Sequence, residues 1–135
     1  MAEKLDRITE DSIKQLVDNF YIKIRQDTEL GSIFNETIGY SDEEWQPHLD
    51  KLYAFWSSVM LASRRYHGNP MKKHIALLPF DLSLFDRWLE LFEETAYELY
   101  TKEIAIHYQA KSQKIAQNMR LVLNSKFHKS DNSIM

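Results

Sequence analysis

The sequence predicts an all-α single domain, and three observations support this fold class. Apolar residues recur at the i, i+3, i+4 and i+7 spacing of a helix through most of the chain. Hydrophobic residues make up 44% of the 135 positions, which is enough to build one buried core. The chain has three glycines and three prolines, too few for the many turns of a β-sandwich or barrel.

The first predicted helix follows Thr9, whose hydroxyl is suited to cap the helix N-terminus. Glu10 and Asp11 then place negative charge at the positive end of the helix dipole. The expected buried stripe consists of Ile13, Leu16, Val17, Phe20, Tyr21 and Ile24. Gly31 is expected to interrupt the pattern, with residues 32–38 forming an irregular or single-turn connection.

The second long helix is predicted to begin after Ser41, because Ser41 and Glu44 have the spacing of a capping box. Its stripe consists of Trp45, His48, Leu49, Leu52, Phe55, Trp56, Val59 and Met60. Pro47 lies inside this pattern, where it removes a backbone donor and crowds the preceding turn. Either the helix bends there, or residues 41–46 form a separate turn and the main helix begins at Pro47. Residues 63–70 are polar and predict a loop.

A short apolar segment headed by His74 separates this loop from the last two predicted helices. The third helix carries Phe85, Trp88, Leu89, Phe92, Ala96 and Leu99. The fourth carries Ile104, Tyr108, Ile115, Met119 and Val122, and we expect it to end near Lys126. One domain is expected over residues 1–135, with its core at about 9–126 and a disordered tail at about 127–135.

Composition and charge argue against several classes of function. A formal charge of −3 gives no electrostatic footprint for nucleic acid. The chain has no cysteine, which excludes disulfides, iron–sulfur clusters and thiolate zinc sites. No apolar run approaches the ~20 residues of a membrane span, and the first residues lack the apolar region of a signal peptide. We therefore expect a cytoplasmic protein that engages neither nucleic acid nor a membrane.

Three polar-tipped side chains lie on the predicted buried stripes: Tyr21, His48 and Trp88. Each one alone is typical of a core residue that finds a local partner. Together they come from three different helices, and each needs a hydrogen-bond partner when buried. A shared cavity that holds a polar ligand would satisfy all three. His74 adds a separate signal, because a neutral imidazole on a short apolar segment suits the proximal ligand of a haem iron.

Other kinds of site fit the sequence less well. Glu44 with His48, and Glu103 with His107, share helix faces at i, i+4 spacing, which leaves a di-iron bundle open. Such bundles, however, use a Glu-x-x-His spacing. A row of carboxylates is interpreted as a solvated helix face; it comprises Glu90, Glu93, Glu94 and Glu98. The chain has no His-Glu-x-x-His motif, phosphate-binding glycine loop or nucleophile elbow.

From about Thr9 to Lys126 the chain resembles the truncated haemoglobins, specifically the third group of that family. The matching pieces, in chain order, are Phe20-Tyr21, Gly31 to Asn35, Asp42 to Trp45 with His48, Phe55-Trp56, Pro70 to His74, Pro79-Phe80, and Trp88 with Leu91 to Glu94. The glycine pairs typical of the first two groups are not evident. The resemblance implies a truncated globin fold, a two-over-two helical sandwich around haem.

The resemblance also implies roles for individual residues. His74 would be the proximal iron ligand of haem b (iron protoporphyrin IX), with Tyr21, His48 and Trp88 on the distal side. Two further residues, Phe34 and Leu52, would pack against the haem face and the bound ligand.

Further haem contacts are expected from the helix stripes and from the charges near them. The apolar walls would come from Phe55, Phe85, Leu89, Ile115 and Met119. The candidates to hold the propionates are Lys51, Arg64, Arg65 and Lys73, with Tyr66 as a hydroxyl donor.

This pocket predicts binding of dioxygen or another diatomic ligand, because distal donors stabilise a bound ligand that carries negative charge. We expect redox chemistry on oxygen, nitric oxide or peroxide rather than oxygen delivery. Whether the protein is an enzyme stays open, with nitric oxide dioxygenase and peroxidase-like activity as candidates. Nitric oxide dioxygenation would need an external reductase as partner. The alternatives are reversible oxygen binding or sensing, and a helical interaction module whose inward aromatic residues are only core.

Overall fold

The structure, a computed structural model, describes residues 3–69 and 83–134, with side chains to residue 124. Its helices are α1 (Glu10–Gln26), α2 (Thr28–Ile38), α3 (Asp42–Leu61), α5 (Leu84–Leu99) and α6 (Lys102–Ile134). The all-α prediction is confirmed over the described residues.

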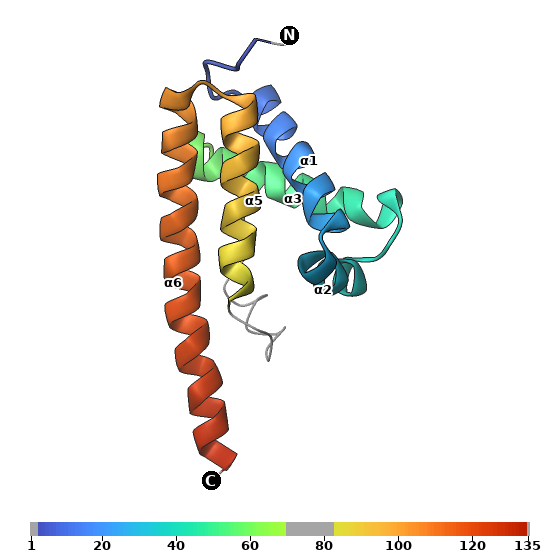
Figure 1. Cartoon of the computed structure of the whole chain (residues 1–135), viewed down its shortest axis with the longest axis vertical. Coiled ribbons are helices and arrows are strands. Elements are labelled where there is room, and N and C mark those ends of the chain that lie inside the picture. Colours follow the sequence, from blue (N-terminus) through green and yellow to red (C-terminus); the bar gives the residue numbers. More distant parts are fainter. Residues whose placement is uncertain (1–2, 70–82, 135) are drawn as a thin grey trace.

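Helix α1 is the central element of the fold. Helices α5 and α6 lie side by side and antiparallel, while α3 runs across their direction (Figure 1). Helix α1 packs against α2, α3 and α5, so it joins the crossing helix to the antiparallel pair. The core lies at this junction, where the α1 stripe meets Trp45 and Trp56 of α3 and Phe92 of α5.

Helix α1 forms as its sequence predicts. Thr9 Oγ1 accepts a hydrogen bond from Ser12 N at 3.0 Å, and Ser12 Oγ accepts one from Thr9 N at 2.9 Å. This reciprocal capping satisfies donors that a helix start otherwise leaves unpaired. All six residues of the predicted stripe are buried.

The connection predicted over residues 32–38 is wrong, because the chain forms helix α2 there. Asp27 caps this helix: its Oδ2 atom accepts from Leu30 N at 3.0 Å. Gly31 lies inside the helix and does not interrupt it. A Cβ at this position would lie 2.7 Å from the carbonyl oxygen of Arg25, so the glycine allows the end of α1 to approach α2 closely.

Helix α3 settles the question left open at Pro47. The chain forms one helix from Asp42 to Leu61 with Pro47 inside it, and Ser41 and Glu44 form the predicted capping box. The helix persists past the proline because the cap fixes its start and two fully buried indoles, Trp45 and Trp56, hold it against the core. Residues 62–69 form the predicted loop.

Helix α6 extends further than expected. It continues to Ile134, past the predicted end near Lys126 and through the segment expected to be a disordered tail. The physical reason is that the sequence contains neither proline nor glycine after Pro79. Nothing in residues 127–134 therefore removes a backbone donor or favours a left-handed terminating residue.

The N-terminal segment covers the turn between α5 and α6, so contacts reach beyond the core limit expected at residue 9. Leu5 N donates to Leu99 O at 2.8 Å, and Thr101 N donates to Leu5 O at 2.9 Å. Lys4 Nζ donates to the carbonyl oxygens of Tyr97 and Glu98, both at 2.7 Å. These bonds satisfy carbonyl groups that the end of α5 leaves exposed.

None of the described helices has the length and apolar composition needed to cross a membrane.

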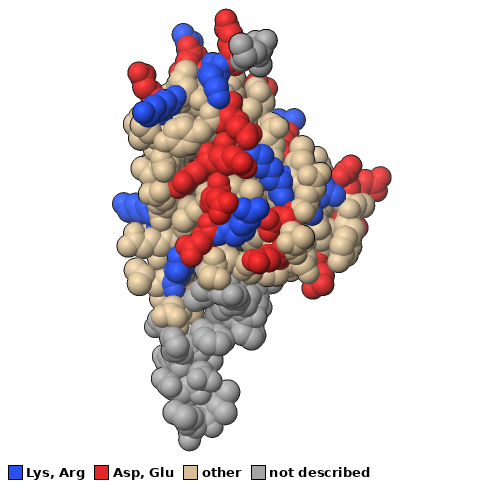
Figure 2. All heavy atoms as spheres, viewed as in Figure 1, with Lys and Arg blue, Asp and Glu red and all other residues tan. Residues whose placement is uncertain are grey.

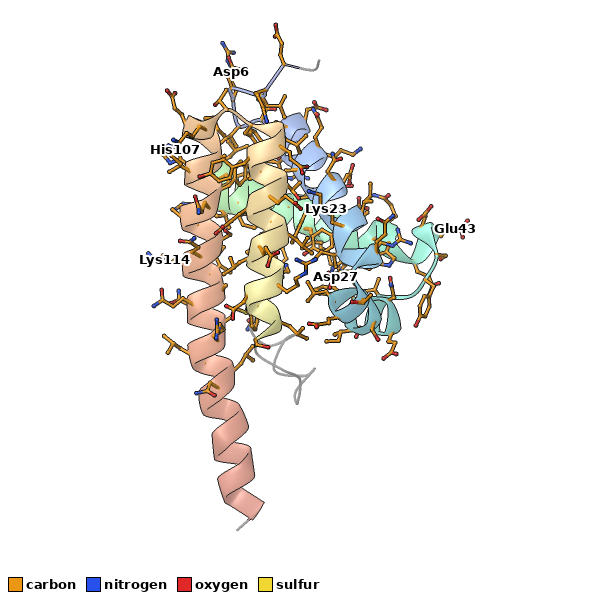
Figure 3. The ribbon with its side chains drawn as sticks, in the orientation of Figure 1. Asp6, Lys23, Asp27, Glu43, His107 and Lys114 are labelled. Atoms are coloured by element: carbon orange, nitrogen blue, oxygen red, sulfur yellow. The ribbon has the colours of Figure 1, made fainter. Side chains whose placement is uncertain are left out.

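Asp27 joins three helices through one carboxylate, at the labelled position where α1 passes into α2 (Figure 3). Its Oδ1 atom accepts a hydrogen bond from Arg87 Nε of α5 at 2.8 Å, and its side chain is 8% exposed. Burial alone would raise its pKa. The backbone N–H groups of Leu30 and Glu29, together with the Arg87 guanidinium, outweigh this and lower the pKa below its ordinary value.

Asp27→Ala is expected to lower the free energy of unfolding by about 1–2 kcal/mol at neutral pH, because the α2 cap is lost. Since the folded-state pKa is lowered, the stabilisation is complete above the ordinary aspartate pKa and disappears as the pH falls through the folded value. Urea unfolding followed by circular dichroism should therefore show the two proteins converging in acid.

Asp42→Ala is the matched control, since its ion pair with Arg25 at 2.9 Å has a carboxylate that is 95% exposed. We expect it to cost less than about 1 kcal/mol. Equal losses in the two variants, or a gap for Asp27→Ala that does not close in acid, would contradict this account.

Candidate functional site

The structure brings together the three polar-tipped residues that the sequence singles out. Tyr21 comes from α1, His48 from α3 and Trp88 from α5. The rings of Tyr21 and His48 meet edge to face, with centroids 6.1 Å apart. The indole N–H of Trp88, which can only donate, is close enough to the Tyr21 hydroxyl to lower the pKa of the phenol. Three helices thus place their polar tips in one small region of the core.

The Tyr21 phenol is protonated at neutral pH. Burial raises its pKa to about 12, although the hydrogen bond from Trp88 opposes this effect. Because the Trp88 N–H can only donate, it cannot accept the phenolic proton, which can be donated to a further group. The Nε2 atom of His48 is also shielded from solvent. The region therefore holds hydrogen-bonding groups in a setting of low polarity, where such bonds are stronger than in water.

Trp45, in α3, contacts two of the predicted site residues, Tyr21 and His48. Its ring centroid lies 5.9 Å from that of Tyr21 and 5.5 Å from that of His48. It also stacks on Phe34 of α2 at 6.3 Å with an interplanar angle of 27°. The ring is fully buried, so it forms a fixed surface against which the other three side chains are positioned.

The orientation of the Trp45 indole is itself fixed by hydrogen bonds. Its Nε1–H donates to Gly39 O at 3.0 Å and to Asn35 Oδ1 at 3.2 Å, which ties α3 to the end of α2. The Arg25 guanidinium lies 5.1 Å above the ring centroid. The helical pattern places Trp45 on the buried stripe but does not predict this positioning role. Its spacing of three residues before His48, on the same helix face, was the available signal.

Trp45→Phe is expected to lower the free energy of unfolding by about 1–3 kcal/mol, because the Gly39 carbonyl loses its donor while the aromatic packing is mostly kept. Thermal and urea unfolding measure this loss. Tyr40→Phe is the control, since Tyr40 is 70% exposed and should change stability little. A Trp45→Phe protein as stable as the control would show that the indole bonds contribute nothing.

The other predicted contacts are placed as follows. Phe34 packs against Tyr21, with ring centroids 6.0 Å apart. Leu52 and Phe55 are half-buried and continue the α3 face that carries His48. Tyr66 is half-buried and packs edge to face on Phe55 at 5.3 Å.

The remaining predicted residues lie on other parts of the chain. Met119 is buried in α6, whereas Lys51 is exposed on α3. Arg65, a candidate for a propionate contact, instead pairs with Glu10 at 2.7 Å. The predicted iron ligand His74 and the basic residue Lys73 lie outside the described residues.

The acidic residues of α5 form ion pairs across the surface. Figure 2 shows acidic and basic side chains intermixed over this face. Lys23 of α1, labelled in Figure 3, contacts Glu94 at 3.1 Å and Glu98 at 3.0 Å, while Arg87 contacts Glu90 at 2.7 Å. Among the described residues, no three histidines or carboxylates gather closely enough to hold a metal ion.

The comparisons with known proteins concern nearly the whole chain. Residues 6–124 match the family model described as bacterial-like globin. A curated relative, the group 3 truncated haemoglobin ctb of Campylobacter jejuni, is 41% identical over 120 residues, covering 89% of this chain and 94% of the relative. The crystal structure of group III truncated haemoglobin from Campylobacter jejuni matches with a TM-score of 0.87 and 40% identity, covering 90% of this chain and 95% of that one.

Proposed function

The chain belongs to the bacterial-like globin family, among the group III truncated haemoglobins, and from this premise we propose that it binds a diatomic ligand at a haem held between α3 and α5. Membership of this family implies haem as the cofactor. The observation that supports the ligand proposal is the meeting of Tyr21, His48 and Trp88, with Trp88 close enough to the Tyr21 hydroxyl to lower its pKa.

The described residues fit a haem in their chemistry. Tyr21, His48 and Trp88 form what we call the polar cluster. Half-buried apolar side chains adjoin it, as a porphyrin face requires: Phe34 lies next to Tyr21, and Leu52 and Phe55 share the face of His48. When bound, haem b supplies a redox-active iron that takes diatomic ligands. We assign the proximal ligand to His74, a further apolar contact to Met119, and the propionates to Lys51, Tyr66 and Lys73.

The residues of this chain would act on the ligand through hydrogen bonds. Trp88 fixes the direction of the Tyr21 phenol by donating to its oxygen, which leaves the phenolic proton for the ligand. His48 is a second donor in the tautomer that carries its proton on Nε2. Tyr21 is 4% exposed and the Nε2 atom of His48 is shielded from solvent, so these protons are not offered to bulk water instead.

We further propose that the protein carries out redox chemistry on oxygen, nitric oxide or peroxide rather than oxygen delivery. One hydrogen bond to a charged ligand is worth roughly 1.5–3 kcal/mol, which slows ligand release about tenfold to a hundredfold. A ligand that is released slowly stays at the site long enough to react, whereas oxygen delivery needs rapid release of the ligand. Nitric oxide dioxygenation would need electrons from a separate reductase.

Haem titration of the purified chain tests the proposal. We expect a Soret band that saturates at one haem per chain, and a further shift of that band when carbon monoxide is added to the reduced protein. Chain that stays colourless with added haem, or a broad band that carbon monoxide does not shift, would contradict the proposal and favour the helical interaction module.

A further inference from the structure

A column of stacked aromatic rings leads from the polar cluster into the core. Trp88 stacks on Phe92 with centroids 5.4 Å apart and an interplanar angle of 5°. Phe92 in turn stacks on Trp56 of α3 at 4.8 Å and 16°. The Trp88 end of this column is the same indole that lowers the pKa of Tyr21. Two indoles are thus joined face to face through a single benzene ring.

The column continues to a buried pair of tyrosines at the α5–α6 turn, at the far end of α5 from Trp88 (Figure 1). The Trp56 ring lies 6.0 Å from that of Tyr108, and the Tyr108 ring lies 4.9 Å from that of Tyr100. The two phenolic oxygens are 3.1 Å apart and hydrogen-bonded. Both tyrosines are at most 1% exposed. Every ring of the column therefore contacts the next one.

Apolar packing alone does not explain the residue types in this column. A phenylalanine pair would fill the space of Tyr100 and Tyr108 without burying two hydroxyl groups that each need a partner. Indole and phenol rings are the aromatic side chains that lose one electron most readily. Four of the five rings are of this kind: Trp88, Trp56, Tyr108 and Tyr100. Their order places indoles next to the candidate site and phenols at the far end.

We propose that Trp88, Trp56, Tyr108 and Tyr100 form an electron relay that carries oxidising equivalents from the distal pocket to the buried tyrosine pair when the protein reacts with hydrogen peroxide. This relay rests on the proposed haem-dependent function. It gives the oxidising equivalents a defined destination away from the polar cluster, and Phe92 bridges the two indoles.

The electrons and protons balance as follows. Reduction of one hydrogen peroxide to two waters takes two electrons and two protons. Tyr108 gives up one electron along the column and transfers its phenolic proton to the Tyr100 oxygen at 3.1 Å, while the Tyr100 hydroxyl releases its own proton to solvent. A one-electron donor of the ascorbate class supplies the second electron and later reduces the tyrosyl radical, with protons taken from solvent.

Proton transfer must accompany oxidation of the tyrosine pair. Burial raises the pKa of Tyr108, and it also raises that of Tyr100, so both phenols are protonated at neutral pH. An oxidised phenol that kept its proton would be a buried cation, which the apolar surroundings disfavour. The 3.1 Å hydrogen bond provides the acceptor that avoids this charge.

Freeze-quench electron paramagnetic resonance tests the relay in the haem-loaded full-length protein mixed with hydrogen peroxide. We expect a neutral tyrosyl radical in the unmodified protein, and a signal reduced several-fold in the Tyr100→Phe/Tyr108→Phe double variant. Tyr40→Phe is the matched control, because its hydroxyl lies on the surface and off the column. Its signal should equal that of the unmodified protein.

Trp56→Phe gives an independent readout that leaves both tyrosines in place. It removes the oxidisable ring in the middle of the column, so a tryptophanyl signal should accumulate where the unmodified protein shows a tyrosyl one. An undiminished tyrosyl signal in the double variant, or a Trp56→Phe spectrum like that of the unmodified protein, overturns the relay. Absence of a Soret band before peroxide is added is a separate outcome, which overturns the proposed haem function and the source of the oxidising equivalents with it.

Discussion

Replacement of His74 by alanine should abolish stable haem binding, whereas alanine at His67 or His107 should leave it unchanged. An iron held by one protein ligand loses that bond with the imidazole, and the remaining apolar contacts retain the porphyrin only weakly. His67 is exposed in the loop after α3, and His107 is exposed on the outer side of α6 (Figure 3). Neither can face a haem buried next to Tyr21.

Haem retention on gel filtration, followed by the Soret absorbance of the eluted protein, measures this effect. Free imidazole added to His74→Ala should restore the band, because it replaces the missing ligand in the space that the side chain leaves. Loss of fold would not be repaired in this way, so the rescue separates ligation from stability. A His74→Ala protein that retains haem fully would transfer the role of proximal ligand to another residue.

The elements that could be predicted from the sequence are those fixed by local chemistry. The α1 stripe and the capping pair Ser41–Glu44 depend on residues within one or two helical turns, and both are confirmed. Helix α2 does not follow from the local pattern, because a glycine usually interrupts a helix. Gly31 lies inside α2 because the Arg25 carbonyl oxygen of α1 approaches it closely, and no local pattern contains this tertiary contact.

The candidate site shows the same division between local and tertiary information. Helical periodicity placed Tyr21, His48 and Trp88 on buried faces, and the structure brings them together. Periodicity could not predict which of them interact with each other, because the approach of Trp88 to Tyr21 depends on how α5 packs against α1. Nor could it predict that Trp45 holds the cluster in place, since its partners Gly39 and Asn35 lie on the preceding loop and helix.

Tyr21→Phe should accelerate release of dioxygen from the reduced haem protein by about tenfold to a hundredfold, the equivalent of one lost hydrogen bond to a charged ligand. The change removes the phenolic donor and keeps the ring, which packs on Phe34 and Trp45. Stopped-flow displacement of oxygen by carbon monoxide measures the rate. Tyr40→Phe, the same chemical change at an exposed position, should leave it unaltered.

Trp88→Phe separates two roles for the indole. The Trp88 N–H is close enough to the Tyr21 oxygen to lower the pKa of the phenol, so it should act on the ligand by orienting the phenol. The effects of Tyr21→Phe and Trp88→Phe on oxygen release should then be non-additive, with a coupling energy on the order of 1 kcal/mol in a double-mutant cycle. Strictly additive effects would mean that the indole donates to the ligand independently of Tyr21. The coupling energy thus decides whether Trp88 acts on the ligand through Tyr21 or donates to the ligand itself.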